Sequence, residues 1–174
     1  MKRLVPALVA ACLSLPVLAQ DKNAMTAFYG HESDIDRYGL SYRFKPFWSD
    51  VWGGWHASLS PEVEASYLHY TGNRRHTNDN TGELGALVRF RFERGLGAVR
   101  PYLDLGLGGA GLTDTHLGDK DLGSAFQFTE HVGFGLAIDQ TWSIGYRYTH
   151  YSNAGIASNN DGLDLHNVVL EVKF

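Results

Sequence analysis

The chain has 174 residues and a net charge of −4, and its 20 Gly, 9 Tyr, 9 Phe and 4 Trp favour strands and turns over helices. The acidic balance argues against nucleic acid as a partner, because phosphate recognition needs an excess of Lys and Arg. The length suits one domain, and nothing in the composition marks a linker.

The first residues have the features of an export signal. A short basic region (Lys2-Arg3) precedes a largely apolar stretch from Leu4 to Leu18, and Val17-Leu18-Ala19 supplies compact residues where a signal peptidase cleaves. We therefore expect residues 1–19 to be a signal peptide and residues 20–174 to form the exported domain. Cleavage removes two of the 15 basic residues, which leaves 13 against 19 acidic residues and a net charge of −6.

Two alternatives to an export signal are disfavoured by the same residues. A membrane anchor is disfavoured because the apolar run is too short to span a bilayer and contains Pro6 and Pro16. A lipoprotein signal would acylate Cys12, but it would leave an apolar region of only Leu4 to Ala11. Cys12 is the only cysteine, so a mature chain without it has no disulfide, thiol nucleophile or cysteine metal site.

Eight segments of the exported domain alternate apolar and polar residues with a period of two, and turn signals separate them. In the fourth segment, for example, Val88 and Phe90 oppose Arg89. An even number of strands is typical of single-chain membrane barrels. The pattern predicts an all-β fold, an eight-stranded antiparallel transmembrane β-barrel. The expected strands are residues 23–31, 36–47, 55–70, 83–93, 99–110, 125–138, 142–152 and 164–174.

The two faces of these strands differ in chemistry. One face is rich in Tyr, Phe, Leu and Val, and the other carries charges beside many glycines. In a small barrel we expect the charged face to point inward, where its residues pair and Gly makes room. The charged residues are Arg43, Lys45, Glu62, Glu64, Arg89, Arg91, Asp104, Arg147, Glu171 and Lys173.

A soluble sandwich or lipocalin-like barrel would reverse these faces and expose the charged one. The export signal and the aromatic C-terminus, Phe174, favour the membrane barrel, because a strand that ends in an aromatic residue resembles the insertion signal of bacterial outer-membrane barrels. We therefore expect an integral protein of the Gram-negative outer membrane.

Residues able to do chemistry gather on the last two strands. His150 and Ser152 fall on the apolar face of residues 142–152, and Asp164 falls on the apolar face of residues 164–174. With both termini in the periplasm, the first of these strands rises toward the cell exterior by roughly 25 Å. The three groups are therefore expected to meet on the lipid-facing wall near the outer leaflet, where the ester bonds of lipid A lie.

The run from His150 to Gly155, followed by Asn160-Asp161-Gly162, resembles the active-site segment of the lipid A 3-O-deacylase (PagL) family. A weaker likeness extends along the mature chain. The resemblance implies an eight-stranded outer-membrane barrel that removes the ester-linked acyl chain, a 3-hydroxy fatty acid, at position 3 of lipid A without a cofactor or metal. It implies that Ser152 is the nucleophile, His150 the general base and Asp164 the acid that orients the imidazole.

At the position of Asp164 the family members compared carry Glu, so this chain is one methylene shorter there. Asp161 is the fallback for the acid, and His166 is an alternative base. The resemblance also implies an acyl-chain contact at Phe128. Oxyanion or supporting roles are expected for Asn153, Ala154, Gly155 and Asn160.

Other functions remain open from the residues alone. The barrel could be non-enzymatic, with a structural or adhesion role, or it could be an acyltransferase, which would need an acyl pocket in its interior. Arg74, Arg75 and His76 form a basic loop that could contact lipid A phosphates. The expected partners are lipopolysaccharide and the outer membrane, with a homodimer left open.

Overall fold

The computed structural model describes residues 22–73, 79–95 and 97–174. The predicted signal peptide lies outside these ranges, and so do the basic loop residues Arg74, Arg75 and His76. Within the described ranges, no helix is long and apolar enough to cross a membrane.

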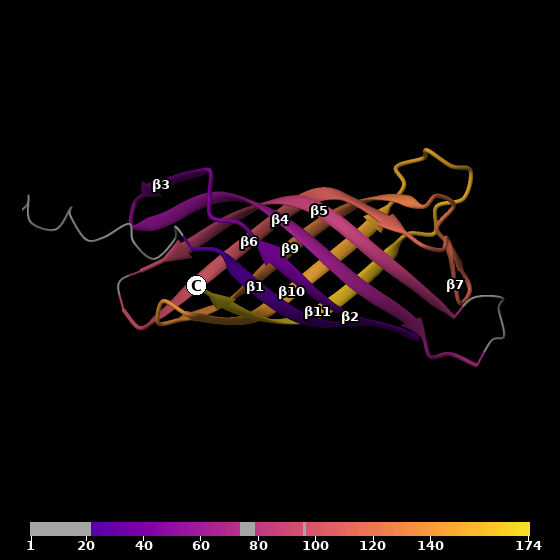
Figure 1. The fold of residues 1–174 in the computed structure, drawn as a ribbon, viewed down its shortest axis with the longest axis horizontal. Helices are drawn as coiled ribbons and strands as arrows, with labels where there is room; N and C mark the ends of the chain where they lie inside the picture. Colours follow the sequence, from indigo (N-terminus) through magenta and orange to yellow (C-terminus); the bar gives the residue numbers. More distant parts are fainter. Residues whose placement is uncertain (1–21, 74–78, 96) are drawn as a thin grey trace, which may run out of the picture.

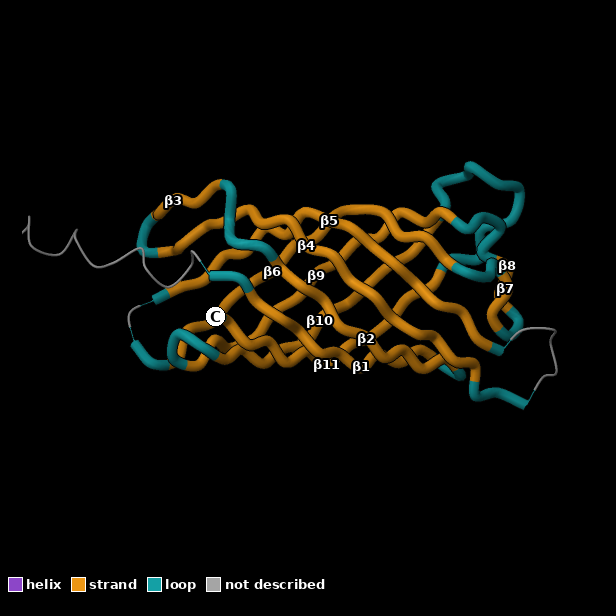
Figure 2. The backbone as a smooth tube through the Cα atoms, in the orientation of Figure 1, coloured by secondary structure: helices purple, strands orange, loops and turns teal. Residues whose placement is uncertain are grey.

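The described chain is built from strands and connecting loops, and the loops lie at the two ends of the molecule (Figures 1 and 2). Strands form because β-branched and aromatic residues alternate with polar ones over long segments. The strands are β1 (Ala24–Glu32), β2 (Ile35–Arg43), β3 (Trp48–Trp52), β4 (Trp55–Tyr70), β5 (Asn80–Arg94), β6 (Val99–Leu112), β7 (His116–Leu117), β8 (Lys120–Asp121), β9 (Phe126–Ile138), β10 (Trp142–Ser152) and β11 (Leu163–Lys173).

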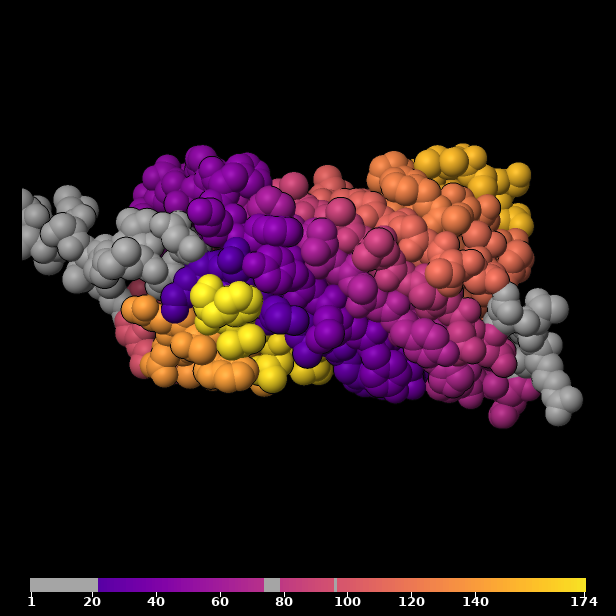
Figure 3. All heavy atoms as spheres, in the orientation of Figure 1, coloured from indigo at the N-terminus to yellow at the C-terminus, as the bar shows by residue number. Residues whose placement is uncertain are grey.

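Eight of these strands close into an antiparallel barrel, as the alternation predicts. The hydrogen-bonded order is β2-β1-β11-β10-β9-β6-β5-β4, and pairing of β2 with β4 completes the ring. The first and last strands are therefore neighbours, with Ala24 opposite Lys173. Figure 3 shows the C-terminal residues, in yellow, beside the N-terminal strand, in indigo. Closure leaves no free sheet edge among the eight strands, which a membrane-spanning sheet requires.

The inner wall of the barrel holds a network of paired charges. Arg91 donates to Asp104 at 2.8 Å and to Glu171 at 2.6 Å. Arg37 contacts Glu64 and Glu83, each at 2.7 Å. These side chains are buried, so each charge depends on its partner rather than on water. The predicted inward direction of the charged face is confirmed for Arg43, Glu62, Glu64, Arg89, Arg91, Asp104, Arg147, Glu171 and Lys173.

The outer wall is apolar, which is the reverse of a soluble protein. Large hydrophobic side chains stand exposed on every barrel strand, among them Leu40, Leu84, Leu107, Phe134 and Val168. Exposed apolar area of this extent would aggregate in water but is matched by hydrocarbon. The wall therefore fits a lipid environment and excludes the soluble alternative.

The second predicted strand, residues 36–47, is wrong in its second half. β2 ends at Arg43, and Lys45 is exposed beyond it instead of pointing inward. Four residues then oppose two on β4 before pairing resumes with Trp48 opposite Leu59, which is a bulge. Pro46 has no N–H to give to the ladder, so one pairing hydrogen bond is lost at the bulge. Past the bulge, β3 forms a hairpin with β4 that extends from the end of the barrel where the C-terminus lies (Figure 1).

The opposite end of the barrel is closed by an apolar cluster that the alternation did not predict. The segment expected as a plain loop, residues 113–123, contains the small hairpin β7–β8. From it Leu117 and Leu122 reach into the barrel, where they are buried with Tyr70, Tyr151 and Leu163. Tyr151 and Leu163 belong to β10 and β11, so the cluster packs against the inner side of the two strands that carry the predicted site.

Candidate active site on the outer wall

The predicted triad residues lie on the outer wall, near the end of the barrel that is opposite the C-terminus (Figure 1). The loop between β10 and β11 brings His150 opposite Asp164 in the register, and Ser152 pairs with Phe128 on β9. His150 and Ser152 share one face of β10 because they are two residues apart. The side chains of His150 and Asp164 are 34% and 47% exposed.

His150 and Asp164 are in direct contact. His150 Nδ1 lies 2.6 Å from Asp164 Oδ1, and because an ionised carboxylate can only accept, Nδ1 is the donor when Asp164 is ionised. Side chains directly opposite on neighbouring strands are the closest cross-strand pairs. The shorter acid therefore reaches the imidazole, and the missing methylene does not separate the two groups.

Asp164 has two further contacts that the sequence did not predict. The hydroxyl of Tyr148, on the same face of β10, donates to Asp164 Oδ1, the oxygen that also faces His150. The backbone N–H of Asp164 donates to Glu32 Oε2, at the end of β1, over 3.0 Å. Both the side chain and the backbone of the acid are thereby held from neighbouring strands. No motif signalled this, because the partners are distant in sequence.

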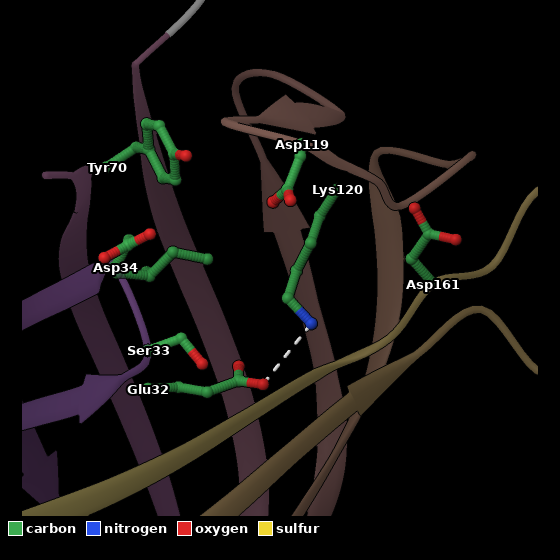
Figure 4. A pocket seen from close by; sticks show the side chains of 8 residues that line it. Glu32, Ser33, Asp34, Tyr70, Asp119, Lys120 and Asp161 are labelled. Atoms are coloured by element: carbon green, nitrogen blue, oxygen red, sulfur yellow. Dashed lines mark ion pairs between the residues drawn. The ribbon is translucent and has the colours of Figure 1, made fainter. Parts of the chain in front are cut away.

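Lys120 ties the β7–β8 hairpin to the strand that carries the acid. Its Nζ lies 3.3 Å from Glu32 Oε1 and donates to the carbonyl oxygen of Gly162 over 3.1 Å. Figure 4 shows the Lys120 side chain extended toward Glu32 in a polar pocket that Asp34, Asp119 and Asp161 also line. Lys120 therefore links the end of β1, the β7–β8 hairpin and the residue that precedes β11.

The loop after Ser152 is organised around the buried side chain of Asn153. Its Nδ2 donates to the carbonyl oxygens of Leu122 at 3.0 Å and Asn159 at 2.7 Å, and its Oδ1 accepts from Gly155 N–H at 2.8 Å. The side chain of Asn160 accepts from the Asn153 N–H through Oδ1 at 2.9 Å. This leaves the Asn160 Nδ2 group and the Ala154 N–H as donors without a partner among the described residues.

Asp161, the fallback for the acid, lies elsewhere. Its Oδ2 accepts from the backbone N–H of Asp121 over 2.7 Å, and it makes no hydrogen bond or ion pair with His150 within the described ranges. The side chain of Asn159 donates to Asp121, and this hydrogen bond lowers the pKa of the Asp121 carboxyl. Asp161 and Asp121 therefore join the β10–β11 loop to the β7–β8 hairpin.

The nucleophile and the alternative base complete the site. Ser152 Oγ and His150 Nε2 make no hydrogen bond among the described residues, so the serine and the imidazole share a face of β10 without being bonded to each other. His166 lies on β11 two residues beyond Asp164, but it contacts Tyr146 OH at 2.5 Å rather than the acid. Phe128 is 38% exposed beside Ser152. No cluster of His, Cys, Asp or Glu in the described part of the chain could hold a metal.

Comparison with known sequences identifies relatives over almost the whole chain. The family model for lipid A 3-O-deacylase (PagL) matches residues 36–173. The lipid A deacylase PagL of Bordetella bronchiseptica is 36% identical over 146 residues, which are 83% of this chain and 79% of that protein. The lipid A deacylase PagL of Pseudomonas aeruginosa is 29% identical over 176 residues, 99% of each chain.

Solved structures agree with this result. The crystal structure of the outer membrane enzyme PagL superposes with a TM-score of 0.69 at 26% identity, over 87% of this chain and 99% of that one. The N-terminal β-barrel domain of Pseudomonas aeruginosa OprF, at 16% identity and a TM-score of 0.51, shares the fold alone. The chain belongs to the lipid A 3-O-deacylase (PagL) family and is an integral outer-membrane β-barrel enzyme.

Proposed function

We propose that this enzyme hydrolyses the ester that links an acyl chain to position 3 of lipid A, with Ser152 as nucleophile, His150 as general base and Asp164 as orienting acid. The observation that carries the proposal is the 2.6 Å contact between His150 and Asp164 on the lipid-facing wall, with Ser152 on the same face. Placing polar and charged side chains against lipid costs free energy unless they bond to each other. Such residues in a membrane protein therefore commonly mark a functional site.

In the first half-reaction, Ser152 Oγ attacks the ester carbonyl carbon while His150 Nε2 takes the hydroxyl proton. Asp164 holds the imidazole by its Nδ1–H and balances the positive charge that the ring acquires. The tetrahedral intermediate then collapses, the bond to the sugar oxygen breaks, and His150 returns its proton to that oxygen. An acyl-serine and deacylated lipid A are the products of this step.

In the second half-reaction, water attacks the acyl-serine and gives its proton to His150. The Ser152–acyl bond breaks, His150 reprotonates Ser152 Oγ, and a free fatty acid leaves. The two steps consume one water molecule and need neither an oxidant nor a reductant. His150 alternates between neutral and protonated forms, which the neighbouring carboxylate of Asp164 supports.

The negative charge on the carbonyl oxygen needs hydrogen-bond donors fixed before the reaction begins. We assign this role to Asn160 Nδ2 and the Ala154 N–H. The Asn160 amide is oriented because its Oδ1 accepts from Asn153 N–H, which leaves Nδ2 for the substrate. Asn153 and Gly155 support the loop, since their own polar groups are bonded to each other and to Leu122 and Asn159.

The membrane orientation supports lipid A in the outer leaflet as the substrate. With the termini in the periplasm, the opposite end of the barrel, which carries the β10–β11 loop, faces the cell exterior. Ser152 then lies near the outer head-group boundary. The exposed Phe128 ring, next to Ser152 across the β9–β10 pair, supplies an apolar contact for the acyl chain.

The test is mass spectrometry of lipid A from Gram-negative cells that express the wild-type chain, Ser152→Ala or the control Ser158→Ala. Ser158 is exposed in the same loop and takes no part in the proposed reaction. We expect loss of one 3-O-linked acyl chain with the wild type and the control, but not with Ser152→Ala. Heat-modifiable gel mobility verifies that each barrel is folded. Unchanged lipid A with all three folded proteins would favour a structural barrel.

A further inference from the structure

The first residues of β11, which include Asp164, extend beyond the neighbouring strand β1. The ladder between β1 and β11 ends at His31 opposite His166. Continuing that register by two residues would place Ser33 opposite Asp164, but Ser33 lies in the turn to β2 with a φ of 49°. The backbone of Asp164 therefore lies where no β1 residue is left to pair with it.

The backbone N–H of Asp164 points to this gap. Along an antiparallel strand, the N–H and C=O groups of successive residues face opposite neighbours. Just past the other end of β11, Phe174 donates its N–H to Asn23 on the β1 side. Phe174 and Asp164 are an even number of residues apart, and the register of β11 is continuous, so Asp164 faces the same side. The pair of Asp164 with His150 therefore has no backbone hydrogen bond of its own, and in such pairs the side chains approach most closely.

Two side chains take the place of the absent strand. Glu32, the last residue of β1, accepts a hydrogen bond from the Asp164 N–H through Oε2 over 3.0 Å. Lys120, on β8, donates to the carbonyl oxygen of Gly162 over 3.1 Å. The two side chains also pair with each other, since Lys120 Nζ lies 3.3 Å from Glu32 Oε1 (Figure 4). The acceptor for Asp164 and the donor for Gly162 are thus supplied by one ion pair.

The hairpin that carries Lys120 is itself bonded to the segment before β11. The backbone oxygen of Asp121 accepts from the Asp161 N–H over 3.2 Å, and the Asp121 N–H donates to Asp161 Oδ2 over 2.7 Å. The Lys120 and Glu32 side chains are only 23% and 20% exposed. Charge-assisted hydrogen bonds in a partly buried network hold their groups more firmly than an isolated surface pair does. The ion pair is therefore able to fix the backbone that it contacts.

We propose that Glu32 and Lys120 are positioning residues, which hold the backbone of Asp164 where its short side chain meets His150. An aspartate side chain has one methylene, so a shift of its backbone passes almost directly to the carboxylate and to the 2.6 Å contact with the imidazole. Displacing a catalytic group by about 1 Å can lower a rate by about 100-fold. This inference rests on the proposed function, in which Asp164 orients His150.

The experiment measures kcat and KM of the purified, detergent-solubilised full chain on lipid A, with the products followed by mass spectrometry. Glu32→Ala should lower kcat by about 10–100-fold and leave KM within about twofold, because it disturbs the acid and not substrate binding. Lys120→Met should lower kcat by about 3–10-fold, since Glu32 keeps its bond to the Asp164 N–H. The control Asp34→Asn removes a carboxylate from the same pocket and should leave both constants unchanged.

A charge swap separates positioning of the acid from simple tethering of the hairpin. Glu32→Lys combined with Lys120→Glu keeps an ion pair, but it presents a donor to the Asp164 N–H and an acceptor to the Gly162 carbonyl. The kcat of the swapped chain should stay as low as that of Glu32→Ala. Glu32→Gln still offers an amide oxygen to Asp164, so its kcat should lie within about threefold of the wild type. Full activity of the swapped chain would reduce the pair to a tether and overturn the proposal.

Heat-modifiable gel mobility verifies that each variant is folded. A folded Glu32→Ala chain with the kcat of the wild type would overturn the positioning role and leave the proposed hydrolysis intact. A rise in KM at unchanged kcat would place Glu32 at the substrate and would also overturn that role. A folded wild type no more active than Ser152→Ala would overturn the hydrolysis, and the positioning role with it. The failure of the inference is therefore distinguishable from the failure of the function on which it rests.

Discussion

Carboxylates occur on both walls of this barrel, but their surroundings differ. On the inner wall, Asp104 and Glu171 share the guanidinium of Arg91 and are buried. On the outer wall, Asp164 faces a neutral or protonated imidazole and a phenol, and Glu130 faces no partner among the described residues. Inner charges thus satisfy one another and fill space, whereas Asp164 and Glu130 flank His150 on the two neighbouring strands. The difference teaches that the buried inner carboxylates pair with permanently charged Arg side chains, whereas Asp164 pairs with an imidazole and a phenol, groups that can exchange protons.

The largest effect is expected from removing the outer charge at Asp164. Asp164→Asn keeps the shape but no longer stabilises a protonated His150, so kcat should fall by about 10³–10⁴-fold. Purified enzyme and a lipid A substrate, followed by mass spectrometry, measure the change. Asp164→Glu is the matched variant, and it should retain activity within about tenfold because it keeps the charge. Full activity of Asp164→Asn would remove Asp164 from the mechanism.

An inner charge should affect stability instead of turnover. Arg91→Met leaves Asp104 and Glu171 buried without their shared partner, so the free energy of unfolding should fall by about 3–5 kcal/mol. Urea-dependent unfolding in lipid vesicles measures it. Arg94→Met, at the exposed end of β5, is the control and should change stability by less than about 1 kcal/mol. Equal stability of the two variants would contradict the structural role of the inner network.

A smaller effect is expected from Tyr148→Phe, which sharpens the comparison within the outer wall. It deletes one of two hydrogen bonds to Asp164 Oδ1, so kcat should fall by about 3–10-fold with little change in KM. Tyr146→Phe is the control on the same strand, because Tyr146 contacts His166 and not the acid. If both variants were equally active, Tyr148 would not position Asp164.

The walls and the core of the site could be predicted from the sequence because the side-chain period of a strand is two. That period alone assigns Arg89 inward and His150 outward. It also places Ser152 on the face of His150. The meeting of His150 with Asp164 depends on the register of β10 with β11 across the loop of residues 153–162, for which the sequence offered only the family resemblance. The chemistry of these residues then came from their type and from the family resemblance.

The supporting contacts could not be predicted in this way. Glu32 reaches Asp164 from a strand more than a hundred positions away, and Lys120 reaches both Glu32 and Gly162 from the β7–β8 hairpin. Such contacts depend on barrel closure and on loop conformation, which periodicity does not contain. The end of β2 was missed for a local reason, since Pro46 interrupts a run whose alternation otherwise continues.

The hairpin that β3 forms with β4 has a consequence for where the chemistry takes place. It carries Trp48, Trp52 and Trp55 at the barrel end that holds the C-terminus, and the remaining tryptophan, Trp142, begins β10 at the same end. Indole rings prefer the head-group boundary of a bilayer, so this belt anchors the barrel at the inner leaflet. Ser152 lies ten residues further along β10, roughly 25 Å higher in a tilted strand. In the proposed reaction, the depth at which an ester would meet Ser152 is therefore set by tryptophans on the opposite side of the membrane.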